Sequence, residues 1–406
     1  MSLIPVAEAL HTVLSKMPQM CTEQVALPDA LGRVLAEDIT ARLTQPWADV
    51  CAMDAYAVRQ EDVANVPCEL KVVGESAAGG SYDAEVQPGE AVRIFTGAPV
   101  PKGADTIIIQ EDVERDGDTV KVLETAPTGK WIRRAGMDFA EGKVLIEAPK
   151  TMTARDLGLA AAANVPWVTV YRQPRVAIIA TGNEVVMPGD PLGDNQIISS
   201  NSVMLNAFVR ALGGIPLDLG IARDDEGSLT RLVQSASQAD MLITIGGASV
   251  GDYDLVGKVL TDEGMDLCFT KVAMQPGKPV IFGTLNGTPV MGMPGNPVSV
   301  GASSTVFLRP CMRVMQGLPA EDGPLESAKL AIDVNEGHTR QEYMRAKMEI
   351  GENGEKLVTP YSKQDSSLLA NFAASDCLII RAPQAPAAKA GERVDIISLN
   401  TGRISL

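Results

Sequence analysis

The sequence predicts a multi-domain protein of α/β plus β class, with a doubly wound α/β domain, a β-rich domain, a mixed linking domain and a C-terminal β-barrel. Three observations predict this organisation. The chain has 406 residues, which is more than one ordinary domain contains. Between about 175 and 318, apolar β-like runs alternate with helical periods, as in a parallel sheet covered by helices on both faces. The regions on either side contain short β-like runs separated by glycine and proline.

The α/β region begins with a continuous apolar run at 175–180, which predicts a buried strand. Helical spacing follows at 203–212, and Gly213 is expected to end that helix. The next apolar run starts at Ile215 and contains Pro216. Because proline cannot donate to a central ladder, this strand is expected near an edge of the sheet.

The second half of this region repeats the pattern. Asp225 is placed to cap the next helix, since its side chain can accept from the first free backbone N–H groups. Residues 241–245 form another continuous apolar run, which opens directly into two glycines. Three more strands and a closing helix are expected, at 267–273, 279–282, 290–293 and from about Pro297.

The flanks differ in texture. Residues 46–135 are rich in glycine, proline and short β-like runs, whereas residues 21–45 and 136–170 are mixed and are expected to pack together as one discontinuous unit. Residues 6–17 follow helical spacing. The last eighty or so residues repeat short β segments, which predicts a terminal β-barrel or sandwich; these segments are 330–334, 343–350, 356–359, 377–381 and 393–399.

The composition excludes several classes of function. Asp plus Glu is 51 and Lys plus Arg is 35, which gives a formal net charge of −16. Such a field repels nucleic acids and acidic membranes, so we expect neither as a partner. An anionic substrate would need local Lys, Arg or a metal ion. The two histidines, His11 and His338, lie far apart in the chain, which disfavours chemistry built on histidine.

The six cysteines are scattered and none forms a CxxC pair, so a zinc ribbon or redox dithiol is not expected. Six lone thiols suit a reducing cytoplasm. The N-terminus lacks the basic flank and apolar core of a signal peptide, and no apolar run approaches the ~18 residues that a membrane helix requires. These features predict a cytoplasmic protein.

Three glycine-rich loops follow strands of the α/β region, at 181–184, 246–254 and 294–299. In an open parallel sheet, ligands gather outside the carboxyl ends of the strands. Glycines let backbone N–H groups close on an anion. A single loop of this kind is more often a tight turn, but three on one edge favour a phosphate- or pterin-sized ligand.

Charged residues surround these loops. Lys271 and Lys278 follow the second loop, and each alone would more often be a solvated lysine. Carboxylates are also numerous there, including Glu184, Asp224 and Asp254. Acids beside a phosphate loop would repel the ligand unless a cation lies between them. The combination therefore predicts Mg²⁺-assisted phosphate chemistry, with Mg²⁺ as the cofactor.

Two further segments are unusual for loops: residues 49–59 are dense in Asp, Met and Tyr, and residues 94–101 form a rigid Gly/Pro turn with one hydroxyl. Together with the glycine loops, they resemble the ordered motifs of the molybdopterin molybdenumtransferases, the MoeA/gephyrin E-domain family. The matching segments are Ala52-Met53-Asp54-x-Tyr56-Ala57-Val58, Thr96-Gly97-Ala98-Pro99-Val100-Pro101, Gly246-Gly247-x-Ser249-Val250-Gly251-Asp252-Tyr253-Asp254, Pro276-Gly277-Lys278-Pro279 and Pro294-Gly295-Asn296-Pro297-Val298-Ser299. Five motifs in the same order are far more specific than any one of them.

The resemblance implies a fold and a reaction. The implied domains are a MogA-like α/β domain at 1–20 with 171–318 and a β-rich domain at 46–135. The other two are a linking domain at 21–45 with 136–170 and a C-terminal β-barrel at 325–406. It implies a homodimer whose cleft lies between the α/β domain of one subunit and the β-rich domain of the other. The implied substrates are adenylyl-molybdopterin and molybdate, with AMP and the finished molybdenum cofactor as products. Molybdopterin adenylyltransferase and acceptor molybdoenzymes are the implied protein partners.

The resemblance also implies roles for individual residues. The matching functional acids are Asp54, Asp138, Glu184, Asp224 and Asp254, of which the last three are expected to hold the metal. The matching substrate contacts are Thr96, Gly246, Gly247, Ser249, Gly251, Lys271, Lys278, Pro294, Asn296 and Pro297. An oxyanion site for molybdate is implied at Arg340, Arg345 and Ser366. Arginine and serine donors suit a small dianion because they replace its hydration shell.

The chain departs from the family pattern at several positions. Gln275 stands where many relatives have a second lysine, and Ala55 and Cys51 replace a usual Gly and Ser. The other departures are Ala135, Met137 and Ile245. Two alternative functions stay open at this point. The α/β domain alone resembles molybdopterin adenylyltransferase, and a non-catalytic scaffold like gephyrin belongs to another class.

Overall fold

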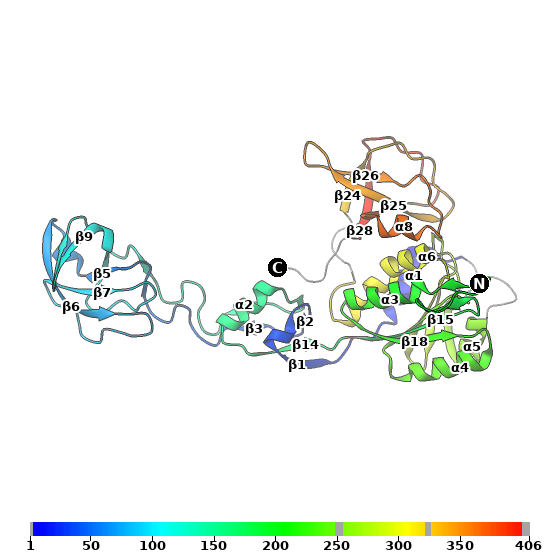
Figure 1. The fold of residues 1–406 in the computed structure, drawn as a ribbon, viewed down its shortest axis with the longest axis horizontal. Coiled ribbons are helices and arrows are strands. Elements are labelled where there is room, and N and C mark those ends of the chain that lie inside the picture. Colours follow the sequence, from blue (N-terminus) through cyan, green and yellow to red (C-terminus); the bar gives the residue numbers. More distant parts are fainter. Residues whose placement is uncertain (1–2, 248–254, 321–325, 400–406) are drawn as a thin grey trace.

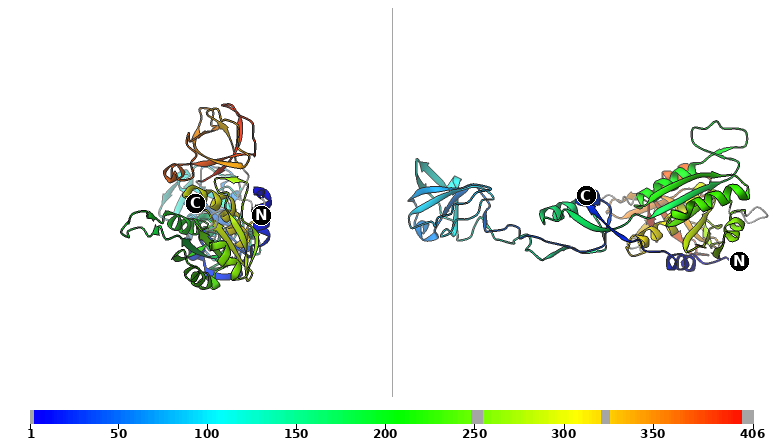
Figure 2. Two further views of the ribbon diagram at one scale, coloured as in Figure 1. Left: turned by 90° about the vertical axis from the view of Figure 1, so that its right-hand side faces the viewer. Right: turned by 90° about the horizontal axis from the view of Figure 1, so that it is seen from below.

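The computed structural model describes residues 3–247, 255–320 and 326–399. The molecule is elongated, and four modules follow one another along it (Figure 1). The β-rich module, residues 50–133, forms one end, and the linking module, residues 22–40 with 144–171, lies in the middle. The other end holds the α/β module, residues 6–15 with 175–315, and the C-terminal barrel, residues 326–398. The second view in Figure 2 shows the same separation.

The linking module is a small antiparallel sheet with one helix. Strand β1 (Thr22–Ala26) pairs along its whole length with β14 (Trp167–Tyr171), so Thr22 lies opposite Tyr171. The sheet order is β1-β14-β2-β13, where β2 is Val34–Leu35 and β13 is Lys150–Thr151. The chain leaves along β3 (Ile39–Thr40) and returns along β12 (Val144–Ile146), which pair with each other.

Helix α2 (Ala154–Ala162) begins at a capping box, in which Thr153 and Asp156 satisfy each other's backbone N–H groups. With the 3-10 turn η1 (Leu27–Ala30) it covers a core that includes Leu35, Phe139 and Met152. This core joins segments from both sides of the β-rich module in the sequence.

The β-rich module is a six-stranded sheet in the order β8-β5-β7-β6-β10-β9. Its strands are β5 (Ala55–Val58), β6 (Cys68–Ser76), β7 (Glu90–Ile94), β8 (Thr106–Ile109), β9 (Val113–Asp116) and β10 (Thr119–Val122). Short 3-10 turns, η2 (Gln60–Val63) and η3 (Gln110–Asp112), join them. At the base, β4 (Val50–Cys51) pairs with β11 (Ile132–Arg133), where the chain enters and leaves the module.

The α/β module has the predicted doubly wound sheet, in the order β18-β15-β19-β23-β22-β20. The first four strands are parallel, and they are β18 (Ile215–Ala222), β15 (Arg175–Thr181), β19 (Met241–Ile245) and β23 (Thr288–Met293). Strand β18 is at an edge, as its proline predicts. The last two, β22 (Ile281–Leu285) and β20 (Met265–Phe269), are antiparallel to their neighbours.

The antiparallel strands have a local cause. Asn286 and Gly287 both have positive φ, at 49° and 84°, and Leu285 pairs with Thr288. A two-residue Asn-Gly turn of this kind joins neighbouring strands as a hairpin. A wholly parallel sheet was therefore the wrong expectation for this part of the module.

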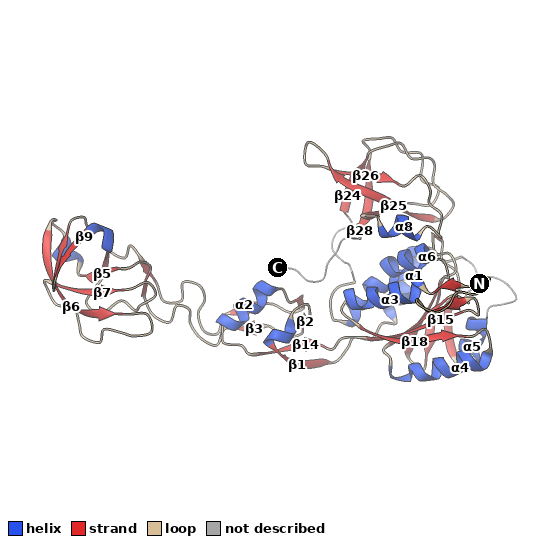
Figure 3. Cartoon of the chain, viewed as in Figure 1, coloured by secondary structure: helices blue, strands red, loops and turns tan. Residues whose placement is uncertain are grey.

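Helices cover both faces of this sheet (Figure 3). One face is covered by α1 (Val6–Ser15), α3 (Ser200–Ala211), α6 (Pro297–Ser303) and α7 (Arg309–Met315), with the π turn η5 (Ser304–Leu308) between α6 and α7. The other face is covered by α4 (Glu226–Ser235) and α5 (Leu255–Asp262). Asp225 caps α4 by accepting from the Ser228 backbone N–H at 2.7 Å. A short parallel pair, β16 (Val185–Val186) and β17 (Ile197–Ile198), precedes α3.

The C-terminal module is a closed five-stranded barrel, as predicted. Its strands are β24 (Glu326–Leu330), β25 (Gln341–Ile350), β26 (Lys356–Pro360), β27 (Cys377–Arg381) and β28 (Arg393–Ser398), and pairing of β25 with β27 closes it. The predicted strand at 330–334 is wrong by four residues. Ala328 and Leu330 point into the barrel core, so the alternating pattern runs through β24. A short helix, α8 (Leu369–Ala373), was not predicted.

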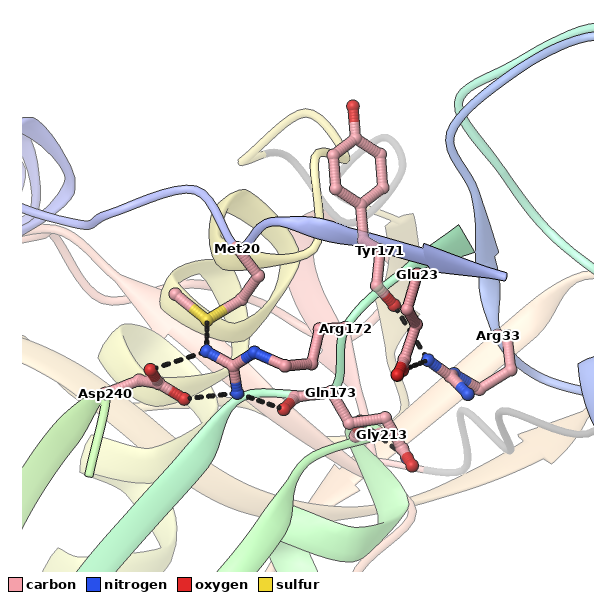
Figure 4. A network of polar contacts seen from close by, with 8 residues as sticks. All are labelled: Met20, Glu23, Arg33, Tyr171, Arg172, Gln173, Gly213 and Asp240. Carbon is pink, nitrogen blue, oxygen red and sulfur yellow. Dashed lines mark hydrogen bonds and ion pairs between the residues drawn. The ribbon is translucent and has the colours of Figure 1, made fainter. Parts of the chain in front are cut away.

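A polar junction anchors the linking module to the α/β module (Figure 4). Arg172 donates to both carboxylate oxygens of Asp240, at 2.7 and 2.9 Å, and Asp240 also accepts from the backbone N–H of Arg175. Nearby, Arg33 donates to the carbonyl of Tyr171 at 3.0 Å and pairs with Glu23. These bonds fix the end of β14 against the start of β15. Within the described residues, none of the helices is long and apolar enough to cross a membrane.

Candidate functional site

The three glycine-rich loops meet at the carboxyl edge of the α/β sheet. The Gly246 N–H donates to the Met293 carbonyl at 3.0 Å, and the Thr181 hydroxyl donates to the Ile245 carbonyl at 3.1 Å. Gly246 and Gly247 have φ of 84° and 65°. A Cβ at Gly247 would lie 2.4 Å from a methyl of Val256, so the turn requires glycine.

Asn201, in the first turn of α3, joins a second pair of these loops. Its amide donates to the Gly295 carbonyl at 2.6 Å, which ties the Pro294–Pro297 segment to the helix that follows the Glu184 loop. Sequence reasoning missed Asn201. The sequence signal that could have found it is an asparagine in the first turn of the helix that comes next after the first glycine loop.

Two of the predicted acids lie at this edge. The Glu184 carboxylate folds back over Gly182, where a Cβ would lie 2.5 Å from its oxygen. Asp224 accepts from the Asn183 N–H at 2.9 Å, and the Asp224 N–H donates back to the Asn183 side chain at 3.3 Å. The structure therefore brings the loops after β15 and β18 together. Three other predicted residues, Ser249, Gly251 and Asp254, lie outside the described residues.

The donor set here suits Mg²⁺, which proteins commonly hold with one or two carboxylates plus substrate phosphates. Glu184 and Asp224 carry carboxylate oxygens, which are the hard ligands that Mg²⁺ prefers. Within the described residues, no group of three or more His, Cys, Asp or Glu side chains converges. An all-protein cage is thus not formed by that part of the chain.

The barrel brings a buried arginine to the same edge. Arg345 on β25 has none of its side chain exposed, and its Nη2 donates to the Asp365 carbonyl at 3.1 Å. Within the described residues, its Nε and Nη1 have no hydrogen-bond partner. Burial lowers the pKa of Arg345 from its ordinary value. A buried guanidinium with two unused donors is costly unless an anion accepts from them.

Ser366 connects that arginine to the third glycine loop. The Asn296 amide donates to the Ser366 hydroxyl at 3.0 Å, and the Val298 N–H donates to the Ser366 carbonyl at 3.1 Å. Arg345 lies on β25 and Ser366 lies in the loop after β26, and the bond from Arg345 to the Asp365 carbonyl makes these two predicted anion ligands neighbours. The structure therefore brings together Asn296, Arg345 and Ser366.

Arg340, the third predicted anion ligand, is engaged differently. Its Nη1 donates to the Met274 carbonyl at 3.0 Å and its Nη2 to the Gln275 side chain at 2.7 Å. These bonds hold the segment that carries Lys278, whose carbonyl accepts from the Val272 N–H at 2.9 Å. Gln275 thus accepts a hydrogen bond that a lysine at this position could not accept.

A second cluster lies in the β-rich module. Asp54, at the start of β5, is exposed and accepts at one oxygen from both the backbone N–H and the hydroxyl of Thr96, at 3.0 and 3.1 Å. These two donors, with a smaller contribution from Arg93, hold the pKa of Asp54 below its ordinary value. The turn is rigid because Cys51 exchanges backbone bonds with Gly97 and Ala98.

Arg93, on β7, packs against residues next to Asp54 and Thr96 and holds them in place. Its guanidinium lies 5.0 Å from the Tyr56 ring and 4.9 Å from the Phe95 ring. It donates to the carbonyl of Ala55 and to the side chain of Gln110. Stacking and hydrogen bonding together orient Ala55 and Tyr56, which follow Asp54, and Phe95, which precedes Thr96. Sequence reasoning missed Arg93, although positions 93 and 95 share one face of a strand.

Asp138 lies beside this cluster in a pocket of about 510 Å³. The pocket is lined by Gln45, Pro46, Trp47, Val50, Gly97, Arg133, Met137 and Asp138. Gly97 follows Thr96, so the pocket adjoins the Asp54 turn. Asp54 and Thr96 therefore belong to the β-rich module, and Asp138 lies in the segment that leaves it. Glu184 belongs to the α/β module and Arg345 to the barrel, and these two modules form the other end of the molecule (Figure 1).

The chain is similar to known proteins over most of its length. Residues 4–164 match the MoeA N-terminal region (domain I and II), residues 177–314 a probable molybdopterin binding domain, and residues 327–399 the MoeA C-terminal region (domain IV). The chain is 34% identical to a molybdopterin molybdenumtransferase of Haemophilus influenzae over 97% of this chain and 98% of that protein. It is 39% identical to molybdopterin molybdenumtransferase 2 of Mycobacterium tuberculosis, over 82% and 85%.

A solved structure is also similar. The molybdopterin biosynthesis MoeA protein of Pyrococcus horikosii superposes with a TM-score of 0.85 at 31% identity, covering 98% of this chain and 100% of that one. The likeness spans all four modules.

Proposed function

The chain belongs to the molybdopterin molybdenumtransferase (MoeA) family, a family of molybdenum cofactor biosynthesis, and on that premise we propose that it inserts molybdate into adenylyl-molybdopterin with release of AMP. The observation that carries this proposal is buried Arg345, beside Ser366, whose Nε and Nη1 atoms have no hydrogen-bond partner among the described residues. In a chain of net charge −16, a buried unpaired cation marks a place for an anion.

Molybdate suits that place. It is a small tetrahedral dianion, and its oxygens can accept from Nε and Nη1 of Arg345 and from the Ser366 hydroxyl. Hydrogen bonds to charged groups contribute about 1.5–3 kcal/mol each, which offsets the desolvation of the guanidinium. Asn296 donates to Ser366 and so leaves the hydroxyl hydrogen of Ser366 for the anion. Arg340, already bonded to Gln275, positions the neighbouring loop.

The glycine-loop N–H groups, Lys271 and Lys278 are the groups that we assign to the pterin and its phosphate. Mg²⁺ would be held by Glu184 and Asp224, together with Asp254. When bound it neutralises phosphate charge and lowers the cost of breaking the phosphoanhydride. The chain's own groups align the dithiolene sulfurs with molybdate, so that the two sulfurs replace two of its oxygens. These oxygens leave as two water molecules, which take the two thiol protons and two protons from solvent. Water then cleaves the phosphoanhydride and frees AMP.

We further propose that each active site is shared between two chains of a homodimer. In one chain, the Asp54 cluster and the glycine loops lie at opposite ends (Figure 1). A substrate of ordinary size cannot contact both ends of one chain. Two chains packed antiparallel would bring the β-rich module of one to the α/β module of the other.

We expect the enzyme to act in the cytoplasm, because all six cysteines are free thiols. Its expected protein partners are the adenylyltransferase that makes its substrate and the molybdoenzymes that accept its product.

The deciding experiment mixes the protein with adenylyl-molybdopterin, Mg²⁺ and molybdate. We expect AMP release that depends on molybdate, together with activation of a cofactor-free molybdoenzyme. Formation of adenylyl-molybdopterin from ATP and molybdopterin instead would show an adenylyltransferase. Tight peptide binding without AMP release would show a scaffold.

A further inference from the structure

One acid in the barrel loop, Asp365, lies close to the buried arginine and does not pair with it. The Nη2 atom of Arg345 donates to the carbonyls of Lys363 and Asp365, at 3.4 and 3.1 Å. Burial lowers the pKa of Arg345, and the negative charge of Asp365 partly opposes that shift. The carboxylate is therefore near enough to act on the guanidinium, yet Nε and Nη1 of Arg345 have no partner among the described residues.

The loop is fastened to the backbone of Arg345 by one amide side chain. Gln364 accepts from the Arg345 N–H at 2.9 Å through Oε1 and donates to the Arg345 carbonyl at 3.0 Å through Nε2. The Tyr361 N–H donates to the same carbonyl at 3.0 Å. These bonds keep the backbone of Asp365 beside the guanidinium, so rotation of the Asp365 side chain decides whether the two charges pair.

Ser367 fixes that rotation. Its backbone N–H and its hydroxyl both donate to Oδ1 of Asp365, at 2.8 and 2.6 Å. These two donors hold the pKa of Asp365 below its ordinary value, and Arg345 makes a smaller contribution. Hydrogen bonds to an ionised acceptor are about twice as strong as neutral ones, so the two bonds compete with an ion pair. Asp365 is also exposed, and moving its carboxylate to the buried Arg345 would remove it from water.

We propose that Ser367 is a positioning residue that holds the Asp365 carboxylate away from Arg345 and so leaves the guanidinium to an oxyanion. Without that restraint, Asp365 is an anion tethered beside a buried cation, and an internal ion pair would satisfy the donors of Arg345. A tethered group competes at a high effective concentration, whereas molybdate must arrive from solution. This inference rests on the proposed function, which places molybdate at Arg345 and Ser366.

The test measures molybdate binding to the full-length protein by calorimetry, in a cycle of two substitutions. Ser367→Ala removes the hydroxyl donor, so we expect molybdate binding to weaken about fivefold or more. Asp365→Asn removes the competing charge and keeps an oxygen that can accept from Ser367, so the affinity should stay within about threefold of the natural value or increase. The double variant should bind molybdate as Asp365→Asn does. This rescue is the deciding result, because a serine that only stabilised the loop would not be rescued by loss of the Asp365 charge.

Ser81→Ala is the matched control. Ser81 makes the same kind of bond, from its hydroxyl to the Asp83 carboxylate at 2.6 Å, in the β-rich module. Its loss should leave molybdate affinity unchanged. Thermal unfolding checks that each variant stays folded, which we expect because Ser367 is exposed. A structure of the Ser367→Ala variant should show the Asp365 carboxylate bonded to Nε or Nη1 of Arg345.

Three results would overturn the proposal. Unchanged molybdate affinity in Ser367→Ala would mean that the hydroxyl does not restrain Asp365. Equal weakening by Ser367→Ala with and without Asp365→Asn would make Ser367 a structural residue. Absence of molybdate binding in the natural protein would remove the oxyanion from Arg345, and this proposal with it.

The proposed function is judged separately, by AMP release. Rescue of molybdate binding in the double variant, without turnover in the natural protein, refutes the function alone. Turnover in the natural protein, with molybdate affinity unaffected by Ser367→Ala, refutes the positioning role alone.

Discussion

The two ends of the molecule present charge in opposite ways. Asp54 in the β-rich module is exposed and accepts from two donors of Thr96. Arg345 in the barrel is fully buried and keeps two donors without partners in the described chain. An exposed, satisfied acid costs the fold little and is ready for chemistry. A buried, unsatisfied cation costs the fold more and is ready for a ligand. Substitutions at the two ends should therefore fail differently.

The largest effect is expected at the acids. Asp54→Ala should abolish AMP release and leave thermal stability nearly unchanged, because Asp54 is exposed and its bonds are to a surface turn. Asp254→Ala should do the same from the other module. The measurement is AMP release alongside a thermal melt. Full activity in either variant would remove that acid from the mechanism.

Mixing those two inactive variants tests whether the ends of different chains meet. If the acids of one site come from two chains, one site of the mixed dimer collects both defects and the other collects none. AMP release should then reappear after co-expression, or after the variants are unfolded, mixed and refolded. Each variant refolded alone is the control. Proven subunit exchange without recovered activity would show that the site is not shared.

Arg345→Met should show the opposite profile. Losing two charged donors should weaken molybdate binding by at least about 100-fold. Because the substitution removes a buried charge and keeps a similar volume, the free energy of unfolding should fall by less than about 1.5 kcal/mol, or rise. Calorimetry with molybdate and denaturant unfolding measure the two quantities. A large loss of stability with unchanged molybdate affinity would make Arg345 a structural residue only.

Substitutions of Thr96 and Arg93 should have a smaller effect, which is a shift of the acid limb of the pH–activity profile. The donors of Thr96 lower the pKa of Asp54 more than Arg93 does, so Asp54 stays ionised to a lower pH than an ordinary aspartate. Activity that needs the carboxylate is then lost as pH falls through that lowered pKa. Thr96→Val should raise the pKa and move the acid limb upward, and Arg93→Met should do so by less.

Carbon NMR of labelled aspartate follows the Asp54 pKa directly, without turnover. Arg93→Lys should keep most of the charge effect but lose the stacking between Tyr56 and Phe95. If Arg93→Met shifts the pKa more than Thr96→Val, the electrostatic order of these groups is wrong.

The smallest effect is expected at Gln275. Gln275→Lys should strengthen binding of the anionic substrate several-fold at most, because one partly screened charge contributes on the order of 1 kcal/mol. The substitution also releases Arg340, which now donates to Gln275. Gln275→Met, which releases Arg340 without adding charge, separates the two causes. Titration at low and high salt decides; no gain at low salt means that residue 275 points away from the ligand.

Sequence reasoning reached the fold class because strands and helices alternate and glycines follow the strands. The same pattern predicted that the glycine loops meet, because the carboxyl ends of parallel strands lie at one edge of the sheet. It missed the Asn286-Gly287 hairpin, which is a local signal that was outweighed by the regional pattern. It could not show that Arg340 bonds Gln275, because these residues are 65 positions apart and meet only when the barrel packs on the sheet. Nor could it place Asp54 far from Glu184 in one chain.

The pairing of β1 with β14 bears on how the chain folds during synthesis. Thr22 leaves the ribosome long before its partner Tyr171, so β1 waits while the intervening residues are made. At about 5–20 residues per second the delay is roughly 7–30 s, far longer than a small β module needs to fold. The β-rich module can therefore close first and bring the two halves of the linking sheet together at its base, where β4 pairs with β11. A nascent chain stalled before residue 167 would carry a folded β-rich module and a β1 strand without its partner β14. Chaperones would meet the chain in that form.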